Sequence, residues 1–209
     1  MIRICVASEN GNKLRQFGEI FSGLATDVLI YTAKELGFTE YPPEDAGTFY
    51  GNSRIKACAV RDYLVEKGEG GEYYVIADDS GISVDALGGA PGVHSARYAG
   101  THAPDSENNR KLIAELKKLG DCDRSAHYTC VITVVKPDGM TVSTAGRVDG
   151  RVIDEPRGSD GFGYDPFFYI DSLGRTFAEL DSATRNGMSH RGQALRKAAE
   201  IIIRDAERR

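Results

Sequence analysis

The chain has 209 residues, of which 41% are hydrophobic and 27% are charged, enough for one domain with a sizeable core. Its formal net charge of −5 excludes the broad positive field of a protein that coats nucleic acid or an anionic membrane. No apolar run approaches membrane-spanning length and no signal-peptide pattern opens the chain. We therefore expect a single domain over residues 1–209 in the cytoplasm.

The cysteines and histidines do not form a metal-binding pattern. The four cysteines show no C-x-x-C spacing, so we interpret them as reduced and structural. The four histidines include no H-E-x-x-H motif and no His/Cys cluster, which argues against zinc.

The N-terminal segment predicts a strand, a polar loop and a helix. Apolar residues alternate over residues 2–6 and then take the helical period at Leu14, Phe17, Phe21 and Leu24. The loop between them offers Ser8, Asn10 and Lys13 at a helix N-terminus, where free N–H groups attract phosphate. The spacing is not that of a Walker A loop. A helix cap beside one solvated lysine explains the same residues equally well.

The next elements are a strand at Val28–Tyr31, a turn with two acids at residues 42–47, and a helix from Thr48 to about Lys67. Phe49, Asn52 and Lys56 lie three and four residues apart in this helix, so they share one face. An ordinary amphipathic helix, with Asn52 and Lys56 on the surface beside a buried ring, remains an alternative.

A buried strand, Tyr73–Ala77, leads into two adjacent acids, Asp78 and Asp79. We expect the strand to end there, with both acids exposed at the sheet edge, and Ser80-Gly81 to turn the chain into a second short strand at residues 82–84. Acids beside the glycine-rich residues 88–92 are typical of a site for a divalent cation and a phosphorylated ligand. For an isolated Asp-Asp pair, a capped turn is the more common explanation.

The second half of the chain supplies further helices and strands. A helix capped by Asp105 or Ser106 runs to Leu119, and Gly192 begins a C-terminal amphipathic helix. Strands at residues 128–136 and 141–148 are joined by Pro137-Asp138-Gly139 into an antiparallel hairpin, so the sheet is mixed. A further strand is expected at residues 167–170.

Two polar segments of this half are candidate ligand contacts. In residues 159–166 (SDGFGYDP), Phe162 stands between two glycines that would leave its ring uncovered for stacking on a planar ligand. A tight turn with Phe162 in the core is an equally good interpretation. A second, basic segment precedes the last helix and contains Arg185, Ser189, His190 and Arg191.

Taken together in this order, the segments resemble the inosine triphosphate pyrophosphatase family. The matching parts are the Ser8–Lys13 loop, EDAGTFYGNSRIK (44–56), residues 77–100, GFGYDP (161–166), TFAEL (176–180) and SHRG (189–192). The resemblance implies an elongated α/β fold, with a long mixed sheet flanked by helices and two lobes that enclose a nucleotide-binding groove, in a homodimer. It also implies Mg²⁺-dependent hydrolysis of deaminated purine nucleoside triphosphates such as ITP, dITP and XTP to the monophosphate and pyrophosphate.

The resemblance also assigns roles to residues of this chain. It makes Asp79 the catalytic carboxylate and Glu44 its partner in holding Mg²⁺. The implied phosphate contacts are Ser8, Asn10, Lys13, Lys56 and Ser80. The implied base-side contacts are Phe162, Gly163, Tyr164 and Asp165, with Phe162 as the stacking ring. The implied residues that close over the purine and bind its six-position oxygen are Arg185, Ser189, His190 and Arg191.

This sequence departs from the family pattern in three places. Glu9 adds a negative charge near the expected phosphates, Gly51 replaces a more common acid, and Arg185 stands where a lysine is usual. Glu9 leaves open a nucleotide-binding sensor that has lost turnover. A pyrophosphatase for modified pyrimidine triphosphates is a further alternative, against which SHRG and GFGYDP argue.

Overall fold

The computed structural model describes residues 1–23 and 27–209, so the predicted helical position Leu24 lies outside it. The described helices are α1 (Gly11–Ser22), α2 (Phe49–Glu66), α3 (Asp105–Lys118), α4 (Ser182–Met188) and α5 (His190–Ala206). The described strands are β1 (Ile2–Val6), β2 (Val28–Thr32), β3 (Tyr74–Val84), β4 (Ser125–Val135), β5 (Thr141–Val152), β6 (Phe168–Ile170) and β7 (Arg175–Thr176). Short 3₁₀ turns occupy residues 85–87, 92–97 and 177–179.

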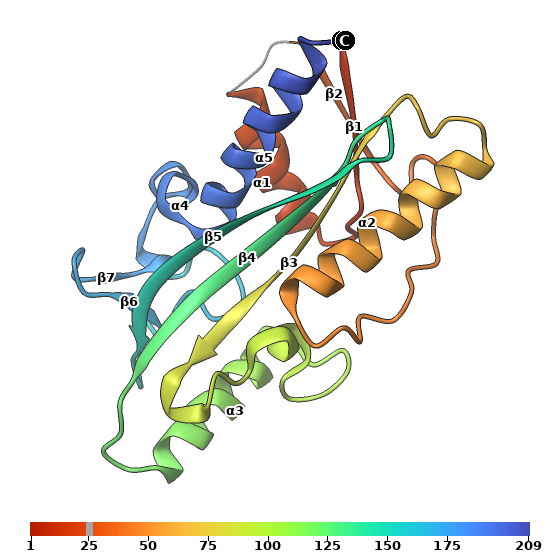
Figure 1. Ribbon diagram of the computed structural model, residues 1–209. Helices are drawn as coiled ribbons and strands as arrows, with labels where there is room; N and C mark the ends of the chain where they lie inside the picture. The colour runs from red at the N-terminus through yellow and green to blue at the C-terminus, as the bar shows by residue number, and fades with distance from the viewer. Residues whose placement is uncertain (24–26) are drawn as a thin grey trace. The chain divides into compact units, whose positions relative to one another are not determined.

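The described strands form one sheet in the order β2-β1-β3-β4-β5-β6-β7 (Figure 1). Strand β1 pairs in parallel with β2 and with β3, whereas β6 pairs antiparallel with β5 and with β7. The turn between β4 and β5 is closed by the Lys136 N–H, which donates to the Met140 carbonyl at 2.8 Å. These pairings confirm the expected α/β class with a mixed sheet, because parallel and antiparallel pairs coexist in it.

The chain divides into two compact units that alternate along the sequence. The first unit comprises residues 1–79, 130–146 and 191–209, apart from the three residues that are not described. The second comprises residues 80–129 and 147–190. The expectation that residues 1–209 act as one pyrophosphatase domain, and that two lobes enclose a groove, stays a prediction.

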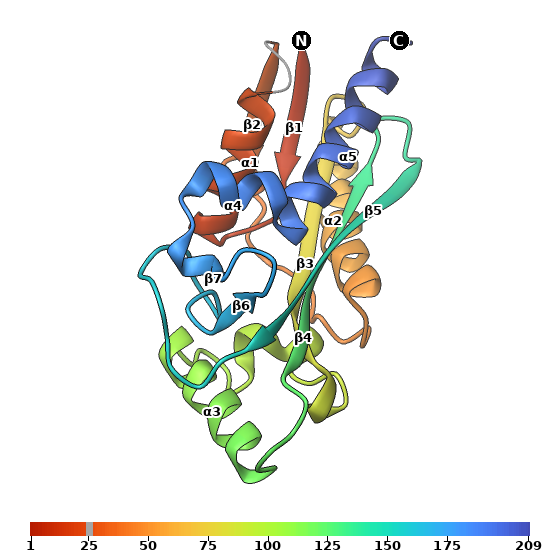
Figure 2. The same ribbon diagram turned by 90° about the vertical axis from the view of Figure 1, so that its left-hand side faces the viewer.

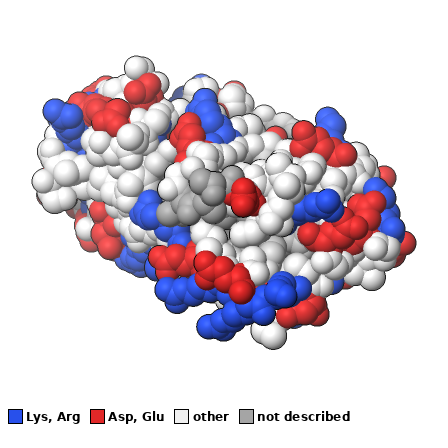
Figure 3. Space-filling view, turned by 90° about the horizontal axis from the view of Figure 1, so that it is seen from above, with Lys and Arg blue, Asp and Glu red and all other residues white. Residues whose placement is uncertain are grey.

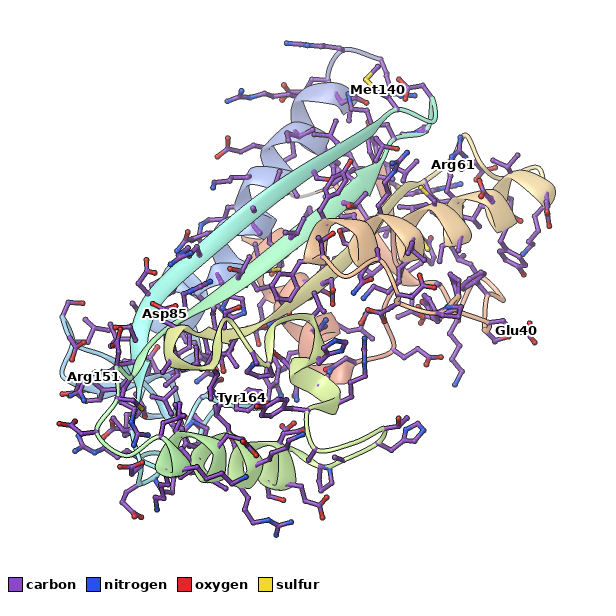
Figure 4. All side chains as sticks on the ribbon, turned by 60° about the horizontal axis from the view of Figure 1, so that its bottom comes forward. Glu40, Arg61, Asp85, Met140, Arg151 and Tyr164 are labelled. Atoms are coloured by element: carbon purple, nitrogen blue, oxygen red, sulfur yellow. The ribbon has the colours of Figure 1, made fainter. Side chains whose placement is uncertain are left out.

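The first unit has a core on each face of its strands. Helices α1 and α5 pack on one face and α2 packs on the other (Figure 2). Because successive strand residues point to opposite faces, Tyr74 and Ile76 of β3 enter the first core while Tyr73, Val75 and Ala77 enter the second. On α2, Arg61 donates to the Pro137 carbonyl at 2.9 Å and thereby ties the helix to the hairpin turn near Met140 (Figure 4).

The second unit has one aromatic-rich core. It joins residues of β3 and β5 to the apolar face of α3 and to the rings of Tyr128, Tyr164, Phe168 and Phe177. Tyr128 meets Phe168 edge-on at 4.6 Å and lies parallel to Phe177 at 5.8 Å between ring centroids. Aromatic pairs of this kind stabilise a core beyond the area that they bury.

Two predicted strands need correction, and one helix was not predicted. Strand β3 does not end at Ala77 but runs without a break to Val84, so Ser80 and Gly81 do not turn the chain. Strand β5 extends past residue 148 to Val152 because Arg151 and Val152 pair with β6. Helix α4 was not predicted; it begins where the Asp181 carboxylate accepts from the Thr184 N–H at 2.8 Å.

Two further features of the structure are the distribution of its charged side chains and the apolar character of its helices. Acidic and basic side chains are intermixed over the face drawn in Figure 3. Across residues 1–23 and 27–209, no helix combines the length and the apolar character needed to cross a bilayer.

Candidate functional site

The two adjacent acids lie in the middle of β3 and are buried. Asp78 is 1% exposed and Asp79 is 7% exposed, so the expected exposure of these acids at a strand end is wrong. A strand continues through two carboxylates only if each is paired, because an unpaired buried charge is very costly. Alternation along β3 sends Asp78 to the face covered by α1 and α5 and Asp79 to the face covered by α2, and each face supplies the cations.

Asp78 holds two cations on its face of the strand. Its Oδ2 atom lies 2.9 Å from Lys13 Nζ on α1 and 3.2 Å from Arg191 Nε on α5. Arg191 Nη1 also donates to Gln16 Oε1 at 2.8 Å, and the arginine side chain is 4% exposed. Burial alone would raise the pKa of Asp78, but the positive charges of Lys13 and Arg191 outweigh it and hold that pKa well below its usual value.

Asp79 faces an amide and an ammonium on α2. Asn52 Nδ2 donates to Asp79 Oδ2 at 3.0 Å, while Asp79 Oδ1 lies 3.8 Å from Lys56 Nζ. The same Lys56 ammonium donates to Glu44 Oε2 at 2.9 Å. Two carboxylates that are 35 residues apart in the sequence therefore converge on one positive charge.

This cluster shifts the pKa values of its members. Burial raises the pKa of Asp79, Lys56 opposes that effect, and the negative charge of Glu44 adds to it, so the net shift is upward. Burial would lower the pKa of Lys56, but the charges of Asp78, Asp79 and Glu44 outweigh it and raise that pKa. The ammonium is therefore charged at neutral pH and compensates the two carboxylates that it touches.

Helix α2 builds this arrangement through simple periodicity. Thr48 caps the helix by accepting from the Gly51 N–H at 3.1 Å, and Asn52 and Lys56 follow one turn apart. Both are buried, at 0% and 8% exposure, so the alternative of two surface residues on an amphipathic helix is wrong.

The loop before α1 contributes less directly. Asn10 is the N-cap of the helix, and its Oδ1 accepts from the N–H groups of Asn12 and Lys13. Ser8 Oγ accepts from the Asn10 N–H at 3.2 Å, and Glu9 is exposed. The cap interpretation therefore holds for Asn10, but Lys13 is not merely solvated, because it pairs with Asp78.

The donor set of Glu44 and Asp79 fits Mg²⁺. Magnesium in nucleotide enzymes is held by one or two carboxylates plus substrate phosphates, and it prefers oxygen ligands. The Lys56 ammonium lies 2.9 Å from Glu44 Oε2 and 3.8 Å from Asp79 Oδ1, so the two carboxylates face one positive charge. Over the described residues no group of three or more His, Cys, Asp or Glu side chains could hold a metal.

In the second unit, the GFGYDP segment is a tight turn held by its own hydrogen bonds. Asp165 Oδ2 accepts from the Phe162 N–H at 3.1 Å, and its Oδ1 accepts from the Tyr128 hydroxyl at 3.3 Å. The Gly163 N–H donates to Asp105 Oδ2 at 2.7 Å. Tyr164, labelled in Figure 4, is buried and donates to the Ser95 carbonyl at 2.8 Å.

The two interpretations of Phe162 were a ring buried in a tight turn and an uncovered ring that stacks on a ligand. The segment is the predicted tight turn, and a Cβ at Gly161 would collide with Asp165, so glycine is required there. Phe162 is only half-buried and is not part of the second unit's core cluster, so stacking on a ligand stays a prediction. Ser80, also in this unit, is half-buried on β3.

The basic segment of residues 185–191 runs from α4 into α5, which begins at His190 and not at Gly192 as expected, and its residues are divided between the two units. Arg185 is 7% exposed and its Nη1 donates to the Leu180 carbonyl at 3.0 Å. Ser189 is buried at the end of α4, and the His190 ring stacks on Tyr128 at 4.5 Å with the planes 5° apart. These three residues belong to the second unit, whereas Arg191 belongs to the first.

Sequence reasoning missed three residues of these clusters: Gln16, which supports Arg191; Tyr128, which supports both His190 and Asp165; and Asp78 as an anchor for two cations. One signal could have revealed Asp78, which has the strand phase of Tyr74 and Ile76 and so faces α1 and α5. Gln16 and Tyr128 depend on tertiary contacts that have no local pattern.

Comparisons with known proteins identify one family over nearly the whole chain. The model of the Ham1 family matches residues 4–201. A Clostridium perfringens protein named dITP/XTP pyrophosphatase is 43% identical over 202 residues, covering 97% of this chain and 98% of that protein. The structure of a HAM1 protein from Coxiella burnetii covers 98% of this chain and 100% of its own, with a TM-score of 0.85 and 37% identity. The Staphylococcus aureus Ham1 protein gives a TM-score of 0.81 at 37% identity, covering 97% of this chain and 99% of its own.

Proposed function

Because the chain belongs to the Ham1 family, we propose that it hydrolyses dITP and XTP, together with ITP, to the nucleoside monophosphate and pyrophosphate. Such an enzyme would clear deaminated purines from the nucleotide pool. The observation that carries the proposal furthest is the convergence of Glu44 and Asp79 on one ammonium in the first unit.

We assign the triphosphate end of the substrate to the first unit. Lys13 and Lys56 would contact phosphate oxygens, and Ser8 and Asn10 would help through the start of α1. Ser80, which belongs to the second unit, is a further candidate for a phosphate contact. Glu44 and Asp79 would hold Mg²⁺. When bound, Mg²⁺ would neutralise phosphate charge and make water a better nucleophile.

The proposed reaction is a direct attack of water, with one carboxylate of the chain taking the proton of that water. Water attacks the α-phosphorus, the bond to the bridging oxygen breaks, and pyrophosphate leaves, so no covalent intermediate is required. Asp79 would accept the proton of the attacking water as the general base. Asp78 would not take this role, because Lys13 and Arg191 hold its pKa low and occupy its Oδ2.

We assign the base to Phe162, Gly163, Tyr164 and Asp165 and to Arg185, Ser189, His190 and Arg191. Hypoxanthine and xanthine present an oxygen where adenine presents an amino group. A site lined with donors would leave two donors facing each other with ATP, which costs roughly 1–3 kcal/mol when buried.

A nucleotide panel with product identification tests the proposal. The protein is incubated with Mg²⁺ and dITP, XTP, ITP, dATP, dGTP or a modified UTP, and the products are separated by ion exchange. We expect monophosphate and pyrophosphate from the first three, and no turnover of dITP by Asp79→Asn. Orthophosphate as the first product would refute the reaction, and preferential turnover of the modified UTP would refute the base class. Binding of dITP without turnover would favour the sensor.

Two further expectations remain predictions. The homodimer is implied by the resemblance to the family, whereas the cytoplasmic location is an expectation from the sequence. Sedimentation of the purified protein would test the first directly.

A further inference from the structure

Asn52 contacts Asp79, one of the two carboxylates that we assign to Mg²⁺, and the loop that carries Glu44, the other one, so both ends of its amide are hydrogen-bonded. The residue is 0% exposed. Its Nδ2 donates to Asp79 Oδ2 at 3.0 Å, and its Oδ1 accepts from the Ala46 N–H at 3.1 Å. Only this orientation satisfies both partners, because the flipped amide would place an oxygen against a carboxylate and an NH₂ against an N–H.

These two bonds connect the strand that carries Asp79 to the loop that carries Glu44. Ala46 is only two residues from Glu44, so the hydrogen bond from its N–H to Asn52 holds the loop that carries Glu44. Glu44 is also held by the Lys56 ammonium, but that side chain is long and flexible and would be drawn toward substrate phosphates. The Asn52 amide is the shorter and more rigid link.

The neighbouring residue permits this close approach. A Cβ at Gly51 would collide with Ala46 Cβ and would press on Thr48 Oγ1 at 3.1 Å. Glycine at this position therefore lets the loop lie directly against the first turn of α2, where the Ala46 N–H reaches Asn52.

We propose that Asn52 is a positioning residue that sets the spacing of Glu44 and Asp79 and leaves Asp79 Oδ1 directed toward the cation. Because Asn52 donates to Asp79 Oδ2, that oxygen is already hydrogen-bonded within the protein, and Oδ1 is the oxygen that faces Lys56. This inference rests on the proposed function for the identity of the cation, while the geometry stands by itself. Groups that orient a ligating carboxylate commonly change metal affinity when they are removed.

The experiment compares metal binding by variants of two buried asparagines. Asn52→Leu keeps the volume and removes both bonds, and Asn52→Ser is a milder variant that keeps one hydroxyl in the buried position. Asn108→Ser is the matched control, because Asn108 is 2% exposed, accepts from the Ala99 N–H at 2.8 Å and belongs to the second unit. Binding of Mn²⁺ to each full-length protein without nucleotide is measured by electron paramagnetic resonance, with thermal unfolding as a second readout.

We expect both Asn52 variants to bind Mn²⁺ about 10- to 100-fold more weakly, and Asn108→Ser to bind it as the unmodified protein does, even where its stability falls as far. In kinetics, the Asn52 variants should need more Mg²⁺ to reach half of their maximal rate. Their KM for dITP, measured at saturating Mg²⁺, should rise by a smaller factor. If Asn52→Leu does not fold, Asn52→Ser carries the comparison.

Unchanged Mn²⁺ affinity in a folded Asn52 variant would overturn the proposal, as would an equal loss of affinity in Asn108→Ser. Mn²⁺ binding and dITP hydrolysis by the unmodified protein distinguish failure of this proposal from failure of the proposed function. If it binds Mn²⁺ but yields no pyrophosphate from dITP, the function fails and the role of Asn52 is still decided by the binding comparison. If it binds no Mn²⁺ with or without dITP, the positioning role is refuted.

Discussion

Replacing Asp78 with asparagine should destabilise the fold strongly, because one buried carboxylate compensates two cations. The change keeps the size of the side chain but leaves Lys13 and Arg191 without their shared anion, at 2.9 and 3.2 Å. Removing one partner of a buried ion pair costs about 3–5 kcal/mol. Lys13 is 16% exposed and can recover some hydration, whereas Arg191 is 4% exposed and still donates to Gln16, so we expect a loss at the lower end of that range, about 3 kcal/mol.

Chemical unfolding at pH 7 measures this cost. For a chain of this length, 3 kcal/mol corresponds to a fall in the unfolding temperature of roughly 6–12 °C. Asp205→Asn is the control, because Asp205 also joins Lys136, Tyr74 and Arg209 but its side chain is 18% exposed, so we expect a loss of about 1 kcal/mol. Equal losses in the two variants would refute the reasoning, since they would show that burial of the Asp78 cluster adds nothing.

Two further predictions concern charge. Lys56→Gln removes the ammonium that compensates two carboxylates, so binding of Mn²⁺ without nucleotide should tighten severalfold while dITP turnover falls; weaker binding in a titration would contradict this. Asp205 has its pKa lowered to about 2, chiefly by the hydrogen bond from Lys136, so its stabilisation is present above the unfolded pKa of about 3.9 and is lost as the pH falls toward 2. The stability difference between the protein and Asp205→Asn should therefore be constant from pH 7 to about 5 and shrink below that; unfolding curves at pH 7, 4 and 2.5 would expose a difference that instead grows in acid.

The sequence predicted most elements because each of them follows a local rule. The alternation of residues 2–6 and the Pro137-Asp138-Gly139 turn correspond to β1 and the hairpin of β4 and β5. The helical period of residues 49–66 likewise gave α2, and the expected sharing of one face by Asn52 and Lys56 is confirmed by their contacts with Asp79. The resemblance to a pyrophosphatase family is confirmed by the matches to relatives of that name.

The burial of Asp78 and Asp79 could not be predicted from local rules. A charged pair is a poor strand interior unless cations from elsewhere compensate it, and these cations come from α1, α2 and α5. Their sequence separation reaches 113 residues for the pair with Arg191, far beyond any local pattern. Strand propensity therefore indicated an end where tertiary charge pairing allows the strand to continue.

The contacts around the base-side residues had the same limit. The sequence indicated a turn at residues 161–166, which the structure contains, but it could not show that Tyr128 connects Asp165 to His190. A stacking ring and a hydroxyl on one strand residue look like ordinary core composition. The roles of these residues toward a purine remain proposals.

The central claim is that a cation-dependent site built on Glu44 and Asp79 directs water to the α-phosphorus of a purine triphosphate. The most direct measurement is hydrolysis of dITP with Mg²⁺ in ¹⁸O-labelled water, followed by mass spectrometry of both products. We predict that the label enters the nucleoside monophosphate and that pyrophosphate contains none. Label in pyrophosphate, or labelled orthophosphate as the first product, would place the attack at another phosphorus and contradict this account.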